Sequence, residues 1–121
     1  MKRCLIVDDS RVIRRVAAKI VQDLGFEVEE AENGKKALEA CRTRMPDLAL
    51  IDMDMPVMDG RTYLRELRGL PGGEKVVAIF CTTDADSSLI EQALAAGADE
   101  FIMKPFDSDI VRSKFLLLDI L

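Results

Sequence analysis

Short apolar runs alternate with amphipathic segments along the whole chain, and this alternation restricts the possible folds more than any other feature of the sequence. A short continuous apolar run is typical of a buried strand, whereas apolar residues three and four positions apart are typical of a helix. The pattern predicts strands at 4–7, 27–31, 48–51, 76–81 and 101–103. It predicts helices at about 11–24, 35–44, around 63–67, at 84–96 and after residue 106.

Local signals agree with these boundaries. Ser10 is a candidate N-cap for the first helix and Gly25 a candidate stop, while Asn33-Gly34 predicts a turn before the second helix. Pro46 ends the second helix, and Gly97 ends the fourth. The first, second and fourth helices therefore each have a predicted beginning or end.

Strands that alternate with helices indicate a parallel sheet covered on both faces. The first, third and fourth strands are continuously apolar and suit the interior, whereas residues 27–31, rich in Glu, suit a charged edge. We therefore predict strand order 2-1-3-4-5 with five helices, a flavodoxin-like doubly wound α/β fold. The length of 121 residues is room for one domain, so we expect residues 1–121 to form a single domain.

The composition excludes several kinds of chemistry. The chain contains no histidine, which rules out His-ligated metals, catalytic triads with histidine and a phosphohistidine on this chain. The formal net charge of −5 disfavours nucleic acid and anionic membranes as partners. Cys4, Cys41 and Cys81 are predicted to be free, buried thiols. With neither a signal peptide nor a long apolar run, we expect a soluble, cytoplasmic protein.

Polar residues follow the predicted strands at the end where ligands bind in such folds. Because right-handed crossovers bring the carboxyl ends of parallel strands to one edge of the sheet, these residues should lie close together. They are Asp8 and Asp9 after the first strand, Asp52 and Asp54 after the third, Thr82 and Asp84 after the fourth, and Lys104 after the fifth.

Carboxylates gathered in one crevice repel one another unless a positive charge neutralises them. Lys104 is one such charge, and a divalent cation such as Mg²⁺, which prefers oxygen ligands, is another. A cation beside a carboxylate, a lysine and a hydroxyl is the set of groups that phosphoryl transfer to aspartate requires. The sequence therefore predicts a phosphoryl-accepting site with no tightly bound organic cofactor.

Four segments carry a resemblance to a known family. VDDS at 7–10, IDMDMPVMDG at 51–60, CTTD at 81–84 and MKPF at 103–106 resemble the motifs of the receiver domain of two-component response regulators. The resemblance covers essentially the whole chain and is greatest to the stand-alone, CheY-like type. It implies one receiver domain over residues 1–121 with no effector domain.

The resemblance also implies a role for each site residue. Asp52 resembles the phosphoacceptor, and Lys104 the lysine that pairs with the phosphoryl group. Mg²⁺ or Mn²⁺ would be held by Asp9, Asp52 and the main-chain carbonyl of Asp54, with Asp8 acting largely through water. Thr82 resembles the switch hydroxyl and Phe101 the switch aromatic, and the Lys104-Pro105 bond resembles one that is cis in this family.

The implied partners are proteins. A histidine kinase or phosphotransfer protein would supply the phosphoryl group, and a downstream protein would bind the surface of the fourth helix, fifth strand and fifth helix. The expected pathway is chemotaxis. The chain itself would be a monomer or weak dimer and not an enzyme in the usual sense. A cell-cycle or stress phosphorelay adaptor, or a phosphate sink, remains the main alternative.

Three further hypotheses concern segments beside this core. Asp54 and Asp84 flank the site and are hypothesised to tune the lifetime of the acyl phosphate. Arg11, Arg14 and Arg15 form either a solvated basic face or a docking surface for the phosphodonor. The tail 115–121 is too apolar for one buried helix face, so part of it is either a ragged end or a contact surface.

Two other protein classes share single features with the chain. Asp52-Met53-Asp54 is similar to the nucleophile motif of haloacid-dehalogenase-type phosphatases. In that family this motif opens the chain and a later acidic pair closes it, whereas here the order is reversed and there is no room for a cap domain. A flavodoxin would need a first loop that cradles phosphate, which Asp8-Asp9 would repel without a cation. Both alternatives are therefore disfavoured.

Overall fold

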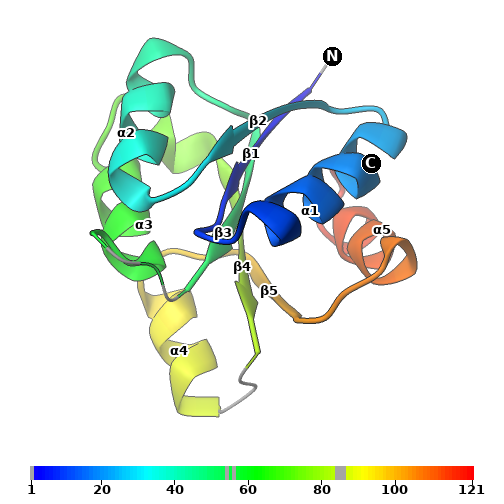
Figure 1. The fold of residues 1–121 in the computed structure, drawn as a ribbon. Helices are drawn as coiled ribbons and strands as arrows, with labels where there is room; N and C mark the ends of the chain where they lie inside the picture. Colours follow the sequence, from blue (N-terminus) through cyan, green and yellow to red (C-terminus); the bar gives the residue numbers. More distant parts are fainter. Residues whose placement is uncertain (1, 54, 56, 84–86) are drawn as a thin grey trace.

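Five parallel strands form one sheet at the centre of the molecule (Figure 1). The computed structural model describes residues 2–53, 55, 57–83 and 87–121, with Ser87 described by its backbone only. The strand order is β2-β1-β3-β4-β5, as predicted. The strands are β1 (Arg3–Val7), β2 (Glu27–Ala31), β3 (Leu48–Asp52), β4 (Val77–Thr82) and β5 (Glu100–Met103).

Helices cover both faces of this sheet. Helices α1 and α5 lie on one face, α2, α3 and α4 on the other (Figure 1). A short 3₁₀ helix, η1 (Gly73–Lys75), precedes β4. The α-helices are α1 (Arg11–Asp23), α2 (Gly34–Thr43), α3 (Gly60–Arg68), α4 (Ser87–Ala95) and α5 (Ser108–Leu117).

Side-chain caps fix where the helices begin. The Ser10 hydroxyl accepts a hydrogen bond from the Ile13 amide at 3.3 Å, which confirms the predicted N-cap of α1. Asn33 caps α2 in the same way, so the predicted Asn33-Gly34 turn is the first turn of the helix itself. Gly25 and Gly97 follow α1 and α4 with φ of 96° and 109°, values that glycine adopts without strain.

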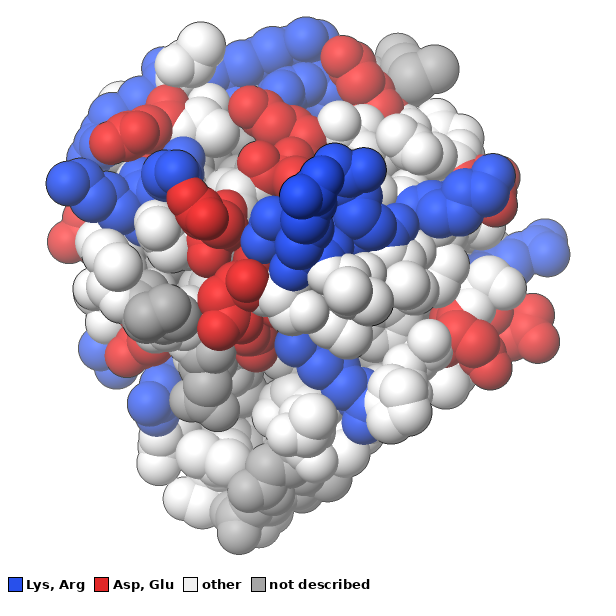
Figure 2. Space-filling model, in the orientation of Figure 1, with Lys and Arg blue, Asp and Glu red and all other residues white. Residues whose placement is uncertain are grey.

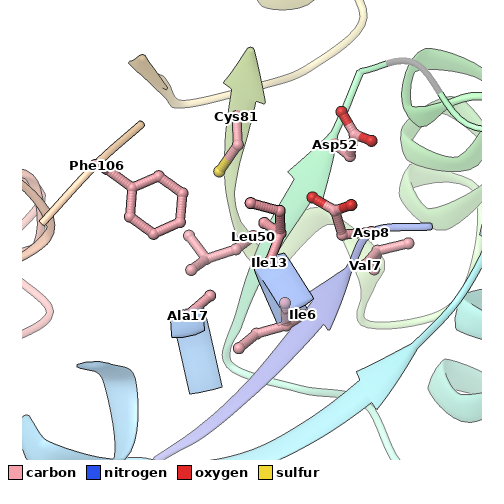
Figure 3. A pocket seen from close by; sticks show the side chains of 9 residues that line it. All are labelled: Ile6, Val7, Asp8, Ile13, Ala17, Leu50, Asp52, Cys81 and Phe106. Carbon is pink, nitrogen blue, oxygen red and sulfur yellow. The ribbon is translucent and has the colours of Figure 1, made fainter. Parts of the chain in front are cut away.

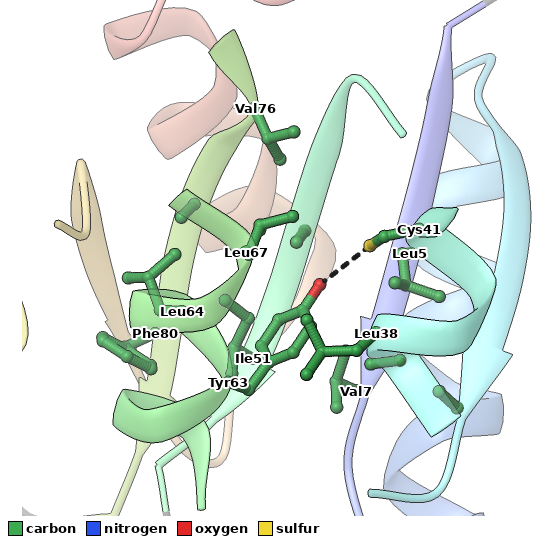
Figure 4. Packing of buried hydrophobic residues seen from close by; sticks show 14 of the residues in the cluster. Leu5, Val7, Leu38, Cys41, Ile51, Tyr63, Leu64, Leu67, Val76 and Phe80 are labelled. Atoms are coloured by element: carbon green, nitrogen blue, oxygen red, sulfur yellow. Dashed lines mark hydrogen bonds between the residues drawn. The ribbon is translucent and has the colours of Figure 1, made fainter. Parts of the chain in front are cut away.

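Each face of the sheet has its own hydrophobic core. On the α2–α3 side, Tyr63, Leu64 and Leu67 pack fully buried against β1, β3 and β4 (Figure 4). The Tyr63 hydroxyl lies 3.3 Å from the Cys41 Sγ, which gives this buried polar group a partner. On the other side, Phe26 and Phe115 meet edge to face with ring centroids 5.3 Å apart. All three cysteines are free and buried, as predicted.

The apolar tail divides between core and surface. Phe115 is fully buried, but Leu116 and Leu117 are 54% and 67% exposed. One helix face is therefore core and the rest faces solvent, as the excess of apolar residues indicated. Within the part of the chain that the structure describes, no helix has the length and apolar character needed to cross a membrane.

One arginine ties together the end of the sheet where the strands begin. Arg68, the last residue of α3, directs all five N–H donors at protein acceptors. Nε and Nη2 donate to the Gly97 carbonyl at 3.2 and 2.7 Å, and Nη2 also to the Asp99 carboxylate at 3.2 Å. Nη1 donates to the carbonyls of Gly73 and Val76 at 2.7 and 2.5 Å. We call this group the Arg68 clamp; it joins α3, η1 and the α4–β5 turn.

Candidate functional site

The opposite end of the sheet, where the strands finish, gathers acidic residues. Asp8 follows β1, and Asp52 is the last residue of β3, next to β1 in the sheet. Oxygen atoms of Asp8, Asp9 and Asp52 lie within 4.8 Å of one another. Asp8 is 3% exposed, so one of the three carboxylates is almost removed from water. The predicted crevice of three carboxylates is therefore present.

Lys104, the residue directly after β5, reaches into this cluster. Its Nζ donates to Asp8 Oδ2 at 2.7 Å and lies 3.4 Å from Asp52 Oδ1. Burial alone would lower the pKa of Lys104, but the hydrogen bond to Asp8 and the charges of Asp52 and Asp8 outweigh burial and raise it. Lys104 is thus held charged between two carboxylates. We call Asp8, Asp9, Asp52 and Lys104 the acidic pocket.

The β1–α1 loop is shaped by bonds to Asp8. The Ser10 amide donates to Asp8 Oδ1 at 2.9 Å, while Arg14 Nη1 donates to the Asp8 carbonyl at 2.7 Å. Arg14 Nε also donates to Glu30 at 3.2 Å, so one guanidinium joins the acidic loop to strand β2. Sequence reasoning missed this role of Arg14, because only the fold brings Glu30 beside α1.

Gly60 allows the start of α3 to approach the end of β3 closely. A Cβ atom at Gly60 would lie 2.3 Å from the Asp52 carbonyl oxygen and 2.9 Å from the Phe80 ring, so only glycine fits there. The Gly60 amide donates to the Met53 carbonyl at 3.1 Å, and Asp59 caps α3 by accepting from the Thr62 amide at 2.9 Å. The first turn of α3 is therefore packed directly against the end of β3.

Thr82 and Phe101 lie on the two strands beyond Asp52. Thr82 ends β4 and is 5% exposed, and its carbonyl accepts from the Lys104 amide at 2.7 Å. The Lys104-Pro105 bond is cis, as the resemblance implied. Phe101 is half-buried on β5 and packs against the α2–α3 core, outside the acidic pocket.

A small cavity lies behind the carboxylates, between α1 and the sheet. Its volume is about 10 Å³, room for one water. Asp8 and Asp52 close one end, while Cys81 and Phe106 lie at the other (Figure 3). Burial raises the pKa of Cys81 to about 12, which favours the neutral thiol over the nucleophilic thiolate. The cavity is too small for an organic cofactor.

The donor set suits a hard divalent cation. Three carboxylates face a single ammonium in this cluster, which leaves negative charge to be neutralised, and carboxylate oxygens are the ligands that Mg²⁺ and Mn²⁺ prefer. Asp9 is exposed and Asp8 buried, so the cluster opens to solvent on one side. The described residues therefore fit such an ion.

Two predicted site residues lie outside the described residues. Asp54, with its main-chain carbonyl as a metal ligand, and Asp84 remain predictions, including their hypothesised effect on the lifetime of the acyl phosphate. The predicted Asp84 start of α4 is likewise not described, and α4 runs over Ser87–Ala95.

The basic residues of α1 divide into two groups. Arg14 has a side chain only 14% exposed and is engaged with Asp8 and Glu30, so it is not part of an exposed face. The Arg15 side chain is 64% exposed, and its Nε lies 3.6 Å from Glu30. Figure 2 shows basic side chains gathered over α1 next to acidic ones. Arg11 and Arg15 therefore remain the candidates for a surface that docks the phosphodonor.

Comparisons with known proteins concern the chain as a whole. Residues 4–115 match the family model of the response regulator receiver domain. The chain is 41% identical over 110 residues to the chemotaxis protein CheY of Bacillus subtilis, covering 90% of each chain. It is 36% identical to CheY of Thermotoga maritima, covering 87% of each.

Solved structures show the same fold. The chemotaxis protein CheY4 of Vibrio cholerae superposes with a TM-score of 0.92 at 30% identity, over 100% of this chain and 99% of that one. The receiver domain of the sensor histidine kinase PA1611 from Pseudomonas aeruginosa, solved with a magnesium ion in its active-site cleft, gives a TM-score of 0.88 at 28% identity, over 96% and 95%. The chain belongs to the response regulator receiver domain family.

Proposed function

We propose that Asp52 accepts a phosphoryl group and that the protein signals through the resulting change in partner binding. The observation that carries this proposal is the acidic pocket, where Lys104 Nζ lies 2.7 Å from Asp8 and 3.4 Å from Asp52. A charged lysine beside a carboxylate at the end of a parallel strand is suited to hold phosphoryl oxygens. Family membership supports the same activity.

The transfer is a substitution at phosphorus. A carboxylate oxygen of Asp52 attacks the phosphorus of a phosphohistidine on the donor protein; the new O–P bond forms as the P–N bond breaks, and the electron pair stays on the imidazole nitrogen. Lys104 holds the phosphoryl oxygens by its charge, and Thr82 donates its hydroxyl to one of them. Asp8, Asp9 and Asp52 would hold Mg²⁺ or Mn²⁺, which neutralises the charge that develops on those oxygens.

The signal is a shift between two arrangements. Thr82 moves toward the phosphoryl group, and Phe101 fills the space that Thr82 leaves, which changes the surface of α4, β5 and α5. Phosphorylation shifts this equilibrium only through contacts that differ between the two arrangements. Phe101 is half-buried and packs at the margin of a core.

The partners are a phosphodonor protein and a downstream protein. Because the chain contains no histidine, a second protein must supply the phosphohistidine. Likeness to chemotaxis proteins over most of their length supports a role in chemotaxis, and a phosphorelay adaptor or phosphate sink is the second candidate. We propose one receiver domain in the cytoplasm, a monomer or weak dimer, with no independent enzyme activity and with neither nucleic acid nor membrane as partner.

A capture experiment tests this function. Wild-type protein and Asp52→Ala are immobilised and exposed to cell extract with beryllium fluoride, an acyl-phosphate mimic, with and without Mg²⁺. We expect the wild type to retain a partner only when both reagents are present, and Asp52→Ala to retain none of it. Recovery of the same partners by both proteins would contradict the switch.

A further inference from the structure

Lys114, on α5, reaches around the open edge of the sheet. Strand β5 is the last of the sheet order, so one of its sides has no neighbouring strand. Along β5, Ile102 packs into the core on the α1–α5 face, and Phe101 packs against the core on the opposite face. Lys114 belongs to the α5 side, yet its Nζ lies 5.0 Å from the centroid of the Phe101 ring. It therefore connects the two faces at this edge.

Glu100 holds the ammonium in this position. Lys114 Nζ lies 3.4 Å from Glu100 Oε1, and the same oxygen accepts a hydrogen bond from the Phe101 amide at 3.0 Å. The two side chains are 28% and 20% exposed, so water only partly screens their charges. The Glu100 carboxylate thus holds the Lys114 ammonium beside β5, where the ammonium also contacts the Phe101 ring.

We propose that Lys114 is a positioning residue that holds Phe101 in its outer, half-buried arrangement and so opposes the switch. The inference rests on the proposed function, in which the Phe101 ring moves toward Thr82. An ammonium over an aromatic face is attracted to the ring, and this attraction is lost when the ring moves inward. Because the contact exists in only one of the two arrangements, it shifts the equilibrium toward that one.

The expected effect follows from the size of such contacts. A partly exposed cation–π contact corresponds to about a two- to fivefold change in an equilibrium constant. Removing it should make the active arrangement more populated by that factor. A ligand that binds only the active arrangement then half-saturates at a concentration about two- to fivefold lower.

The test is a titration with beryllium fluoride in the presence of Mg²⁺, followed by NMR of protein carrying ¹³C in the phenylalanine rings. The Phe101 signal is assigned by its loss in Phe101→Leu. We expect Lys114→Met, which keeps the aliphatic stem, to reach its midpoint at a concentration about two- to fivefold lower than the wild type. Lys114→Arg keeps a cation for the ring and should titrate like the wild type.

A matched lysine separates this effect from a general loss of charge. Lys75 is exposed in η1, before β4 at the other end of the sheet, and Lys75→Met should leave the midpoint unchanged. An unchanged midpoint in Lys114→Met, or equal shifts in Lys114→Met and Lys114→Arg, would overturn the inference. If Asp52→Ala responds like the wild type, the proposed function fails. If Asp52→Ala does not respond and Lys114→Met has the midpoint of the wild type, only the role of Lys114 fails.

Discussion

The two ends of the sheet each hold a cation that is largely removed from solvent, and the two cations face different partners. At the end where the strands begin, Arg68 directs all five donors at four acceptors, three of which are uncharged carbonyls. At the end where the strands finish, Lys104 faces two carboxylates, with Asp9 a third acid close by. The side chains of Arg68 and Lys104 are 21% and 13% exposed.

This difference distinguishes a structural cation, Arg68, from Lys104, a cation in a site that can bind a ligand. The Arg68 clamp uses every donor that its guanidinium has, so it can take no further ligand without losing a bond. The acidic pocket keeps an excess of negative charge, so another cation or a group that bridges the charges can bind there. The partly buried Arg68 therefore stabilises the fold, and the partly buried Lys104 belongs to a site.

The largest effect on stability is expected at the Arg68 clamp. Arg68→Ala leaves the carbonyls of Gly73, Val76 and Gly97 without this donor and should lower the free energy of unfolding by about 3 kcal/mol. Urea unfolding of the variant and of Arg65→Ala, an exposed arginine on the same helix, measures it. If Arg68→Ala lowers the free energy of unfolding no more than Arg65→Ala does, the Arg68 clamp does not stabilise the fold.

Addition of Mg²⁺ should distinguish the two ends. An ion that binds only the folded protein stabilises it by about 1.4 kcal/mol at ten times its dissociation constant. Thermal unfolding with increasing Mg²⁺ should therefore show this gain in the wild type and in Arg68→Ala, but a much smaller gain in Asp9→Asn. Equal gains in the wild type and Asp9→Asn would place the ion elsewhere.

A smaller effect is expected when charge repulsion in the acidic pocket is reduced without a metal. Asp9→Asn removes one of three neighbouring carboxylates and should raise the free energy of unfolding by about 0.5 kcal/mol at low salt. The gain should disappear at high salt, where exposed charges are screened. Urea unfolding at both salt concentrations measures it, and a gain that persists at high salt would point to a cause other than repulsion.

The smallest effect is expected when the native protein is treated with a thiol reagent, because the cysteines on both faces of the sheet are buried. Burial raises the pKa of Cys41 and Cys81; at Cys81 the charge of Lys104 opposes this rise, and the charges of Asp8 and Asp52 add to it. At pH 8 iodoacetamide should leave the native protein unmodified and label all three cysteines only after unfolding. Rapid labelling of Cys81 alone would show that the small cavity behind the acidic pocket opens to solvent.

The sequence was sufficient for the strand order and for the residues of the acidic pocket. Apolar periodicity located the elements, and the polar residues directly after the strands needed only the rule that parallel strands end at one edge. The cation–π contact of Lys114 and the role of Arg14 could not be predicted. Both depend on side chains from elements far apart in the chain, and an isolated arginine or lysine on a helix carries no signal of its partner.

The Arg68 clamp shows the same limit more clearly. In the sequence, Arg68 is one of several basic residues near the end of an amphipathic helix, where such residues commonly lie in solvent. Its acceptors are mostly backbone carbonyls, which every residue has, so no pattern of side chains marks them. Only the packed arrangement of α3, η1 and the α4–β5 turn creates the set of five bonds.

The most direct test of the account is where a phosphoryl group is added. The protein is incubated with Mg²⁺ and a small phosphodonor such as acetyl phosphate and is then reduced with borohydride, which converts an acyl phosphate on aspartate to homoserine. The modified residue is located by mass spectrometry of the peptides. Homoserine is expected at position 52 of the wild type, and only when Mg²⁺ is present. Asp52→Asn should yield none, and Arg65→Ala should react like the wild type. Conversion at Asp8 or Asp9 instead, or none at position 52 in a folded wild-type protein, would contradict the account.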